Sequence, residues 1–156
     1  MRCLRRLTIG SWYKGLVAKL SRSDFARLLA FRTDLRRFER WSERQARAVG
    51  ISPAQHQLML AVKGHDDRRG PSVGEIAEYL LLRPHSAVEL LDRAEAAGLV
   101  VRRKGDADGR VVRVGLTAEG EARLQALTAL HVDELRRMAP SLKHLVEGLD
   151  DDCRGG

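Results

Sequence analysis

Apolar residues recur at helical spacing in the first strongly patterned stretch of the chain. They follow one another at steps of three or four residues, with arginines between them. The apolar positions are Phe25, Leu28, Phe31, Leu35 and Phe38. Such spacing places apolar side chains on one face of a helix. A helix is therefore predicted from Asp24 to about Ala48, and Gly50 is expected to end it.

Three later segments begin with a serine followed three residues on by Gln or Glu. They are SPAQ (52–55), SVGE (72–75) and SAVE (86–89). In a capping box the serine hydroxyl and the Gln or Glu side chain satisfy the first free backbone N–H groups of a helix. Each segment is predicted to open a helix, with Gly64 ending the first and Gly98 ending the third. The second and third helices are close enough to form a helix-turn-helix.

The pattern changes to alternation after Gly98. LVVRRK (99–104) and RVVRVGL (110–116) are rich in β-branched residues, and GDADG (105–109) lies between them. Alternating, β-branched runs around a Gly-containing loop indicate a two-stranded hairpin. A hairpin directly after a helix-turn-helix predicts a winged helix.

Helical spacing returns after the hairpin. Thr117 is placed to cap a long helix that runs to Pro140, and a last short helix is expected over 141–149. The fold class is thus predicted as mainly α with a small β-hairpin wing. The winged helix-turn-helix spans 72–116 inside a domain of 24–149. Helices 24–48 and 117–149 are expected to form a dimerisation region, because their apolar stripes are too long to be buried in one small lobe.

Charge is distributed unevenly along the 156 residues. Six of the 28 Lys and Arg residues lie in 1–23, where there is no acidic residue, which leaves 22 basic and 21 acidic residues beyond. Net charge alone therefore does not argue that the folded part binds a polyanion. Residues 1–23 are read as a loosely ordered basic tail; a surface-binding helix and an incorrectly assigned start codon are the alternatives. Residues 150–156 are expected to be flexible.

The remaining composition bears on location. Cys3 and Cys153 are too few and too far apart for a disulfide framework, which favours a reducing cytoplasm. No apolar run approaches the roughly 20 residues of a membrane span, so no membrane partner is expected. The chain is not predicted to be an enzyme, since no nucleophile with a nearby base and no phosphate-binding glycine loop occurs. His65, Asp66 and Asp67 lie in a loop without a partner motif, so neither a metal nor another cofactor is predicted.

Arg110 and Asp108 are the candidate DNA-binding residues of the wing. A long cation on a hairpin tip fits the narrow, negative minor groove, and a nearby carboxylate can orient its guanidinium. An ordinary surface ion pair on a turn is the alternative, and the preceding helices favour the DNA role. RRK (102–104), which includes the candidates Arg103 and Lys104, is usually a solvated strand edge and is expected here to face the phosphate backbone.

The third helix offers candidates for reading DNA in the major groove. These are Arg83, His85, Ser86, Glu89 and Arg93. Ser86 is expected mainly to cap its helix. Glu89 either accepts from cytosine or only closes the capping box, and His85 is a polar contact rather than a metal ligand because no second ligand sits at helical spacing.

Three stretches together resemble the multiple antibiotic resistance regulator (MarR) family of winged-helix transcription factors. They are SPAQHQLMLAVKGH (52–65), SVGEIAEYLLLRPHSAVELLDRAEAAGLVVRR (72–103) and DGRVVRVGLTAEGEARL (108–124). The resemblance covers about 24–149. It implies a homodimer with intertwined terminal helices, two lobes that read a pseudo-palindromic stretch of double-stranded DNA, and usually repression. It also implies release of DNA by a small aromatic or anionic effector, with Trp41 and His56 as the ligand-binding residues.

Four features depart from the family pattern. Gly109 stands where many members have a second wing arginine, and Pro84 directly precedes the recognition helix. The basic extension before Ser23 is additional, and the first core helix lacks the cysteine of peroxide-sensing members.

The predicted function is a homodimeric, sequence-specific DNA-binding transcriptional regulator, in the form of a repressor released by a small ligand. The alternative is a winged-helix protein-interaction module with only non-specific affinity for DNA. The sequence identifies neither the effector, the operator nor the sign of regulation.

Overall fold

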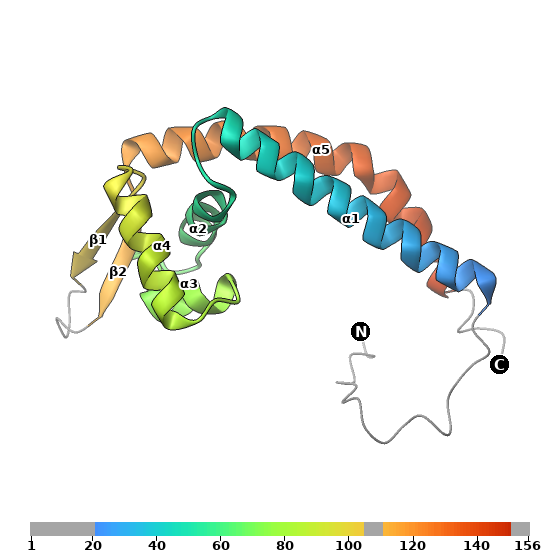
Figure 1. Cartoon of the computed structure of the whole chain (residues 1–156), viewed down its shortest axis with the longest axis horizontal. Helices are drawn as coiled ribbons and strands as arrows, with labels where there is room; N and C mark the ends of the chain where they lie inside the picture. Colours follow the sequence, from blue (N-terminus) through green and yellow to red (C-terminus); the bar gives the residue numbers. More distant parts are fainter. Residues whose placement is uncertain (1–20, 105–110, 151–156) are drawn as a thin grey trace, which may run out of the picture. The chain divides into compact units, whose positions relative to one another are not determined.

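The computed structural model describes residues 21–104 and 111–150 (Figure 1). The chain divides into two compact units, and the division falls inside the first and last helices. One unit comprises 1–36 and 141–156, and the other comprises 37–140. The second unit holds every helix and strand between the two long ones.

The element order is that of a winged helix. Five helices and two strands follow one another as α1 (Arg22–Ala48), α2 (Pro53–Lys63), α3 (Val73–Tyr79), α4 (Pro84–Ala96), β1 (Val100–Lys104), β2 (Val112–Leu116) and α5 (Ala118–Asp150) in the described part of the chain. The prediction of a mainly helical chain with one hairpin is confirmed.

The two strands form an antiparallel ladder in which Val100 pairs with Leu116 and Arg103 with Arg113. A short bridge between Ser72 and Arg113 adds the residue before α3 to the edge of β2. The hairpin is thereby attached to the start of the helix-turn-helix as well as to its end.

Two of the three predicted capping boxes are present. Ser52 and Gln55 close the box at the start of α2, and Ser72 and Glu75 close the box at the start of α3. The third prediction was wrong, because α4 begins at Pro84, with Arg83 as an extended N-cap residue that makes no side-chain cap. Pro84 explains the difference, since its fixed φ suits the first helical position and its missing N–H needs no partner there.

The core of the second unit lies where α2, α3 and α4 meet the hairpin and α5. Its largest fully buried side chains come from each of these elements. They include Leu58, Met59, Ile76, Leu91, Leu99, Val114 and Leu127. Burial of such aliphatic side chains stabilises the fold by roughly 1.5–3 kcal/mol each, so the wing root and both helices of the helix-turn-helix are held by one apolar cluster.

Gly120 allows the closest backbone approach in this core. A Cβ at this position would lie 2.0 Å from the carbonyl oxygen of Leu99. Thr117 fixes the same junction, because its hydroxyl donates to the carbonyl of Gly98 at 2.6 Å and accepts from the N–H of Gly120 at 3.0 Å. The predicted cap at Thr117 is confirmed, and only glycine fits at 120.

The C-terminal helix runs through Pro140 without ending there, so the prediction of a separate last helix was wrong. Proline removes one backbone hydrogen bond and crowds the carbonyl four residues earlier. Pro140 and Arg136 are both exposed, and water can satisfy a carbonyl on the solvent side of a helix.

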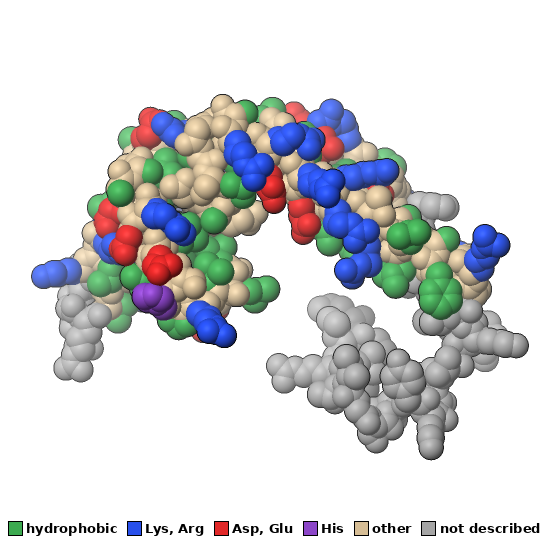
Figure 2. All heavy atoms as spheres, in the orientation of Figure 1, with side chains coloured by type: hydrophobic (Ala, Val, Ile, Leu, Met, Phe, Trp, Pro, Cys, Tyr) green, Lys and Arg blue, Asp and Glu red, His purple; other side chains and the backbone are tan. Residues whose placement is uncertain are grey.

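The first half of α1 carries an uncovered apolar stripe. Phe25 is 61% exposed, Leu28 57% and Leu29 64%. Figure 2 shows hydrophobic side chains gathered at this end of the helix and Lys and Arg side chains along the rest of it. The predicted amphipathic helix is confirmed, but its apolar face has no cover in the described part of this chain.

None of the helices built from the described residues is both long enough and apolar enough to cross a membrane.

Candidate nucleic-acid interface

The exposed face of α4 presents most of the predicted DNA-reading side chains. His85 and Glu89 lie one turn apart, with Nε2 of His85 3.1 Å from Oε1 of Glu89 and side chains 86% and 56% exposed. Arg83 and Arg93 are also exposed, whereas Ser86 is half-buried. Four of the five predicted side chains are thus available to a partner, and Glu89 orients His85 instead of closing a capping box.

Arg102 links the wing to α4. Its backbone N–H donates to Oε1 of Glu95 at 3.0 Å, and its guanidinium donates to Oε2 of Glu95 at 2.8 Å and to Oδ1 of Asp92 at 2.6 Å. Burial opposes the charge on Arg102, but the two carboxylates outweigh it and raise the pKa of this residue. The expectation that all of RRK faces phosphates was therefore wrong for Arg102, which neutralises two acidic side chains of the candidate recognition helix.

The next two residues of β1 differ from Arg102. Arg103 and Lys104 are both exposed, and the Arg103 guanidinium lies over Gly115, where an added Cβ would be 3.5 Å from Cζ. Asp108 and Arg110, predicted to act in the wing, lie outside the described residues.

A second arginine attaches β2 to α3. Nη1 of Arg113 donates to the carbonyl of Gly70 at 3.2 Å and to Oε2 of Glu75 at 3.1 Å. The same Glu75 oxygen accepts from the backbone N–H and the hydroxyl of Ser72, both at 2.7 Å. These two donors are the main reason that the pKa of Glu75 is lowered. The hairpin is thus tied to both helices of the helix-turn-helix by charged hydrogen bonds.

Trp41 and His56, predicted to bind a ligand, belong to a packed cluster with His131 of α5. The Trp41 and His131 rings are 4.9 Å apart and the His56 and His131 rings 4.7 Å apart between centroids. Nδ1 of His131 must donate to the carbonyl of Leu127 at 2.7 Å, so in the neutral ring Nε2 accepts from the hydroxyl of Ser42 at 2.7 Å.

His56 is only 3% exposed. Its burial, together with the neighbouring His131, lowers its pKa to about 4. The ring is therefore neutral near pH 7, and the cluster joins α2 to α1 and α5 within residues 37–140.

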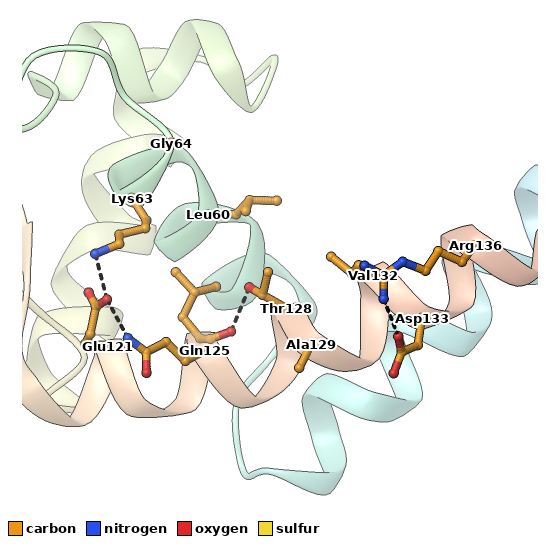
Figure 3. A pocket seen from close by; sticks show the side chains of 11 residues that line it. Leu60, Lys63, Gly64, Glu121, Gln125, Thr128, Ala129, Val132, Asp133 and Arg136 are labelled. Carbon is orange, nitrogen blue, oxygen red and sulfur yellow. Dashed lines mark hydrogen bonds and ion pairs between the residues drawn. The ribbon is translucent and has the colours of Figure 1, made fainter. Parts of the chain in front are cut away.

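An open cavity of about 520 Å³ lies between α2 and α5 (Figure 3). Leu60 and Val132 supply apolar walls, and Lys63 points toward Glu121 with 2.6 Å between Nζ and Oε1. The hydrogen bond from Lys63 is the main reason that the pKa of Glu121 is lowered. Ligand cavities commonly measure about 300–1,000 Å³, so this one can hold a small organic molecule. Trp41 and His56 are not among the described residues that line it.

No pattern in the sequence predicted the two arginine links. Arg102, Arg103 and Lys104 are consecutive basic residues. Their roles differ because side chains alternate between the two faces of a strand and only Arg102 meets the acidic residues of α4 in the described structure. The role of Arg113 was equally hidden, because its partner Glu75 lies 38 residues earlier. His131 carried no motif at all.

Comparison with known proteins agrees with this geometry. Residues 49–111 match the model of the MarR family. The HTH-type transcriptional repressor MdtR of Bacillus subtilis (strain 168) is 31% identical over 80 residues, which cover 51% of this chain and 50% of MdtR. The chain spans about half the length of the curated relatives it matches.

Solved structures extend the similarity over most of the chain. The transcriptional repressor CouR, bound to a 23-mer DNA duplex, is 26% identical, with a TM-score of 0.62 over 88% of this chain and 100% of CouR. The Staphylococcus aureus MepR–DNA complex shares the fold at 17% identity, with a TM-score of 0.62 over 80% of this chain and 91% of MepR. Residues 49–111 therefore belong to the MarR family, and the described part of the chain has the winged-helix fold of solved MarR-family proteins.

Proposed function

We propose that the protein is a homodimeric, sequence-specific DNA-binding repressor whose α4 reads the major groove. The main support for this proposal is the exposed face of α4, from which His85, Glu89 and Arg93 project. Arg102 fixes this helix to the wing. Recognition helices place such polar side chains against base edges, and cations such as Arg83 and Lys104 hold phosphates.

His85 and Glu89 act together in this proposal. With Nε2–H directed at Glu89, the free Nδ1 of a neutral His85 accepts hydrogen bonds, which suits the amino group of adenine or cytosine. Glu89 then orients the imidazole and has one oxygen left for a cytosine amino group. Asp108 and Arg110 are assigned to the wing's minor-groove contact by the family resemblance.

The uncovered stripe of α1 supports the homodimer. Phe25, Leu28 and Leu29 are each more than half exposed, and apolar patches of this kind mark interfaces in proteins. A second copy presents the same stripe, as a two-fold interface requires.

The cavity between α2 and α5 is the proposed effector site. It is lined by apolar side chains together with Gln125, Thr128 and two ion pairs, Lys63–Glu121 and Arg136–Asp133, which suit a small aromatic molecule with polar groups. MdtR and CouR are repressors by name, so we propose that this protein also represses. We propose that a ligand in this cavity relieves the repression.

The proposal is tested by incubating the purified full chain with fragmented genomic DNA at physiological salt and sequencing the retained fragments. The affinity for a retained palindrome is then compared with the affinity for random duplex across a range of salt concentrations. Specific regulators exceed their non-specific affinity by about 10³–10⁷-fold. Uniform retention, or a ratio of specific to non-specific affinity near one, would contradict the proposal. Either result would favour a winged-helix protein-interaction module with only non-specific DNA affinity.

Residue roles are tested on the selected palindrome. Glu89→Gln is expected to change base preference at one position of each half-site, because the charge that orients His85 is lost. Lys104→Gln should weaken all duplexes alike and reduce the salt slope by ~1. Equal behaviour of the two variants would contradict the division between base-reading and phosphate-binding residues.

A further inference from the structure

A second cavity, of about 330 Å³, lies at the root of the wing. Its walls come from the end of α2, the loop 65–70, both strands and the start of α5. It differs in chemistry from the cavity between α2 and α5, because Lys, Arg, Asp and Glu make up half of its lining residues. They are Lys63, Asp67, Arg68, Arg69, Arg103 and Glu121.

The charges of this second cavity do not balance. Asp67 is fully engaged by Arg69, with Nη2 to Oδ2 at 2.7 Å and Nε to Oδ2 at 2.9 Å, and Glu121 pairs with Lys63 at 2.6 Å. The hydrogen bonds from Arg69 are the leading cause that lowers the pKa of Asp67, so this carboxylate stays ionised with its own partner.

Two cations are then left over. Within residues 21–104 and 111–150, neither Arg68 nor Arg103 has a carboxylate partner. The four Lys and Arg side chains of the cavity therefore exceed its two carboxylates by two positive charges.

The backbone is shaped to bring these groups together. Gly70 has a φ of +85°, and a Cβ there would lie 2.1 Å from the carbonyl oxygen of Val114. The loop that carries Arg68 and Arg69 can therefore lie directly against β2. Gly115 leaves the space above β2 in which the Arg103 guanidinium rests.

We propose that this second cavity binds a small, doubly charged anion, such as a phosphate monoester or a dicarboxylate, between Arg68 and Arg103. A volume of 330 Å³ lies at the small end of ligand cavities, about 300–1,000 Å³. Guanidinium groups form paired hydrogen bonds with carboxylates and phosphates, so two free arginines match a dianion in charge and geometry. The site is separate from the DNA-reading face of α4, and it adjoins the proposed effector cavity, with which it shares Lys63 and Glu121.

The test is a titration of the full-length, DNA-free protein with inorganic phosphate and, separately, with succinate. Backbone amide chemical shifts are followed by NMR while sodium chloride keeps the ionic strength constant, because salt screens surface charge. Saturable shifts are expected at residues 63–70 and 114–116. The anion with the lower dissociation constant shows whether the site prefers a phosphate or a dicarboxylate.

Three variants locate the site. Arg68→Gln and Arg103→Gln are each expected to weaken binding by roughly tenfold or more, since each removes a charged hydrogen bond. Lys104→Gln removes the same charge from the same strand but lies outside the cavity, so it should change the affinity by less than about twofold. Thermal unfolding of all three shows that folding is retained.

Three results would overturn the proposal. Shifts that spread over basic residues of the whole surface, or equal losses in Lys104→Gln and Arg103→Gln, would show general surface charge only. A loss of DNA affinity in Arg103→Gln without any loss of anion binding would assign Arg103 to DNA phosphates. Because the titration contains no DNA, the first two results do not depend on whether the protein is a sequence-specific regulator.

Discussion

Arg102 and Glu95 are joined by two hydrogen bonds, from the backbone N–H of Arg102 at 3.0 Å and from its guanidinium at 2.8 Å. The pair fixes where β1 leaves the end of α4. Arg102 also donates to Asp92 at 2.6 Å, so it neutralises two negative charges on the helix that approaches phosphates in the proposed DNA complex.

Arg102→Met is therefore expected to lower both stability and DNA affinity. Surface ion pairs contribute about 0.2–1 kcal/mol and charged hydrogen bonds up to about 3 kcal/mol. Arg102 is 27% exposed, so we expect a loss of about 1–2 kcal/mol in the free energy of unfolding by urea. DNA affinity should fall because Asp92 and Glu95 become unpaired near the phosphates.

The matched control is Arg93→Met, an exposed arginine on the same helix. It should reduce DNA affinity while changing stability by less than about 0.5 kcal/mol. A double-mutant cycle of Arg102→Met with Glu95→Gln should show coupling, and strictly additive effects would refute the link.

Gly120→Ala is expected to destabilise the junction of wing and α5. The new Cβ would lie 2.0 Å from the Leu99 carbonyl, and both groups are backbone-fixed. Overpacking of this kind costs about 1–3 kcal/mol or more. Chemical denaturation of the variant measures the loss.

Gly74→Ala serves as the control within a helix. Its Cβ would meet only the Ser72 hydroxyl, at 3.9 Å. Replacing a helical glycine by alanine should stabilise by about 0.5–1 kcal/mol. If the two variants changed stability in the same direction, the close contact at Gly120 would be wrong.

The sequence predicted those parts of the fold that depend on local chemistry. Ser52 and Ser72 cap helices because their partners lie three residues away, and Gly50 and Gly98 take positive φ where a helix must stop. At Ser86 the same pattern failed, because Pro84 two residues earlier is the stronger start signal.

Interactions between distant segments could not be predicted in the same way. The pairing of Arg102 with α4 depends on which face of β1 meets the helix, and Ser42 meets His131 across 89 residues of sequence. The candidate residues of α4 could be proposed because a helix-turn-helix is a local feature, whereas the polar cavity at Arg103 is assembled from five separate elements.

Leu28→Glu is expected to break the proposed dimer. Leu28 is 57% exposed in the single chain, and each copy would lose the roughly 1.5–3 kcal/mol of a buried leucine. A two-fold interface contains the residue twice, so the dissociation constant should rise about a hundredfold or more. Sedimentation over a range of protein concentrations gives this constant.

Ala30→Glu introduces the same charge on the opposite side of α1, because two residues correspond to roughly 200° of rotation at 3.6 residues per turn. Ala30 is also exposed. This variant should remain as dimeric as the wild type, and equal dissociation of both variants would exclude the stripe as the interface.

His56 makes stability depend on pH in a defined direction. Its pKa is about 4 in the folded protein, against 6.5 for an ordinary histidine. Between these values the unfolded chain binds the proton more readily, so acid favours unfolding. The contribution of neutral His56 is complete above pH 6.5 and is lost as pH falls toward 4.

The expected slope in this interval approaches about 1.4 kcal/mol per pH unit. Asp67, Glu75 and Glu121 also have lowered pKa values, and their contributions to stability are lost only at more acidic pH. Urea unfolding from pH 7 to pH 4.5 therefore reports mainly on histidine.

His56→Gln should flatten this dependence, whatever its effect on stability at pH 7, because the titrating group is gone. His65→Gln is the control, since His65 is half-buried in a loop and contacts the Tyr79 hydroxyl at 3.0 Å. The slope of this variant is compared with that of His56→Gln. An unchanged slope in His56→Gln would mean that His56 can take up a proton without unfolding, and that the cluster with Trp41 and His131 opens to water.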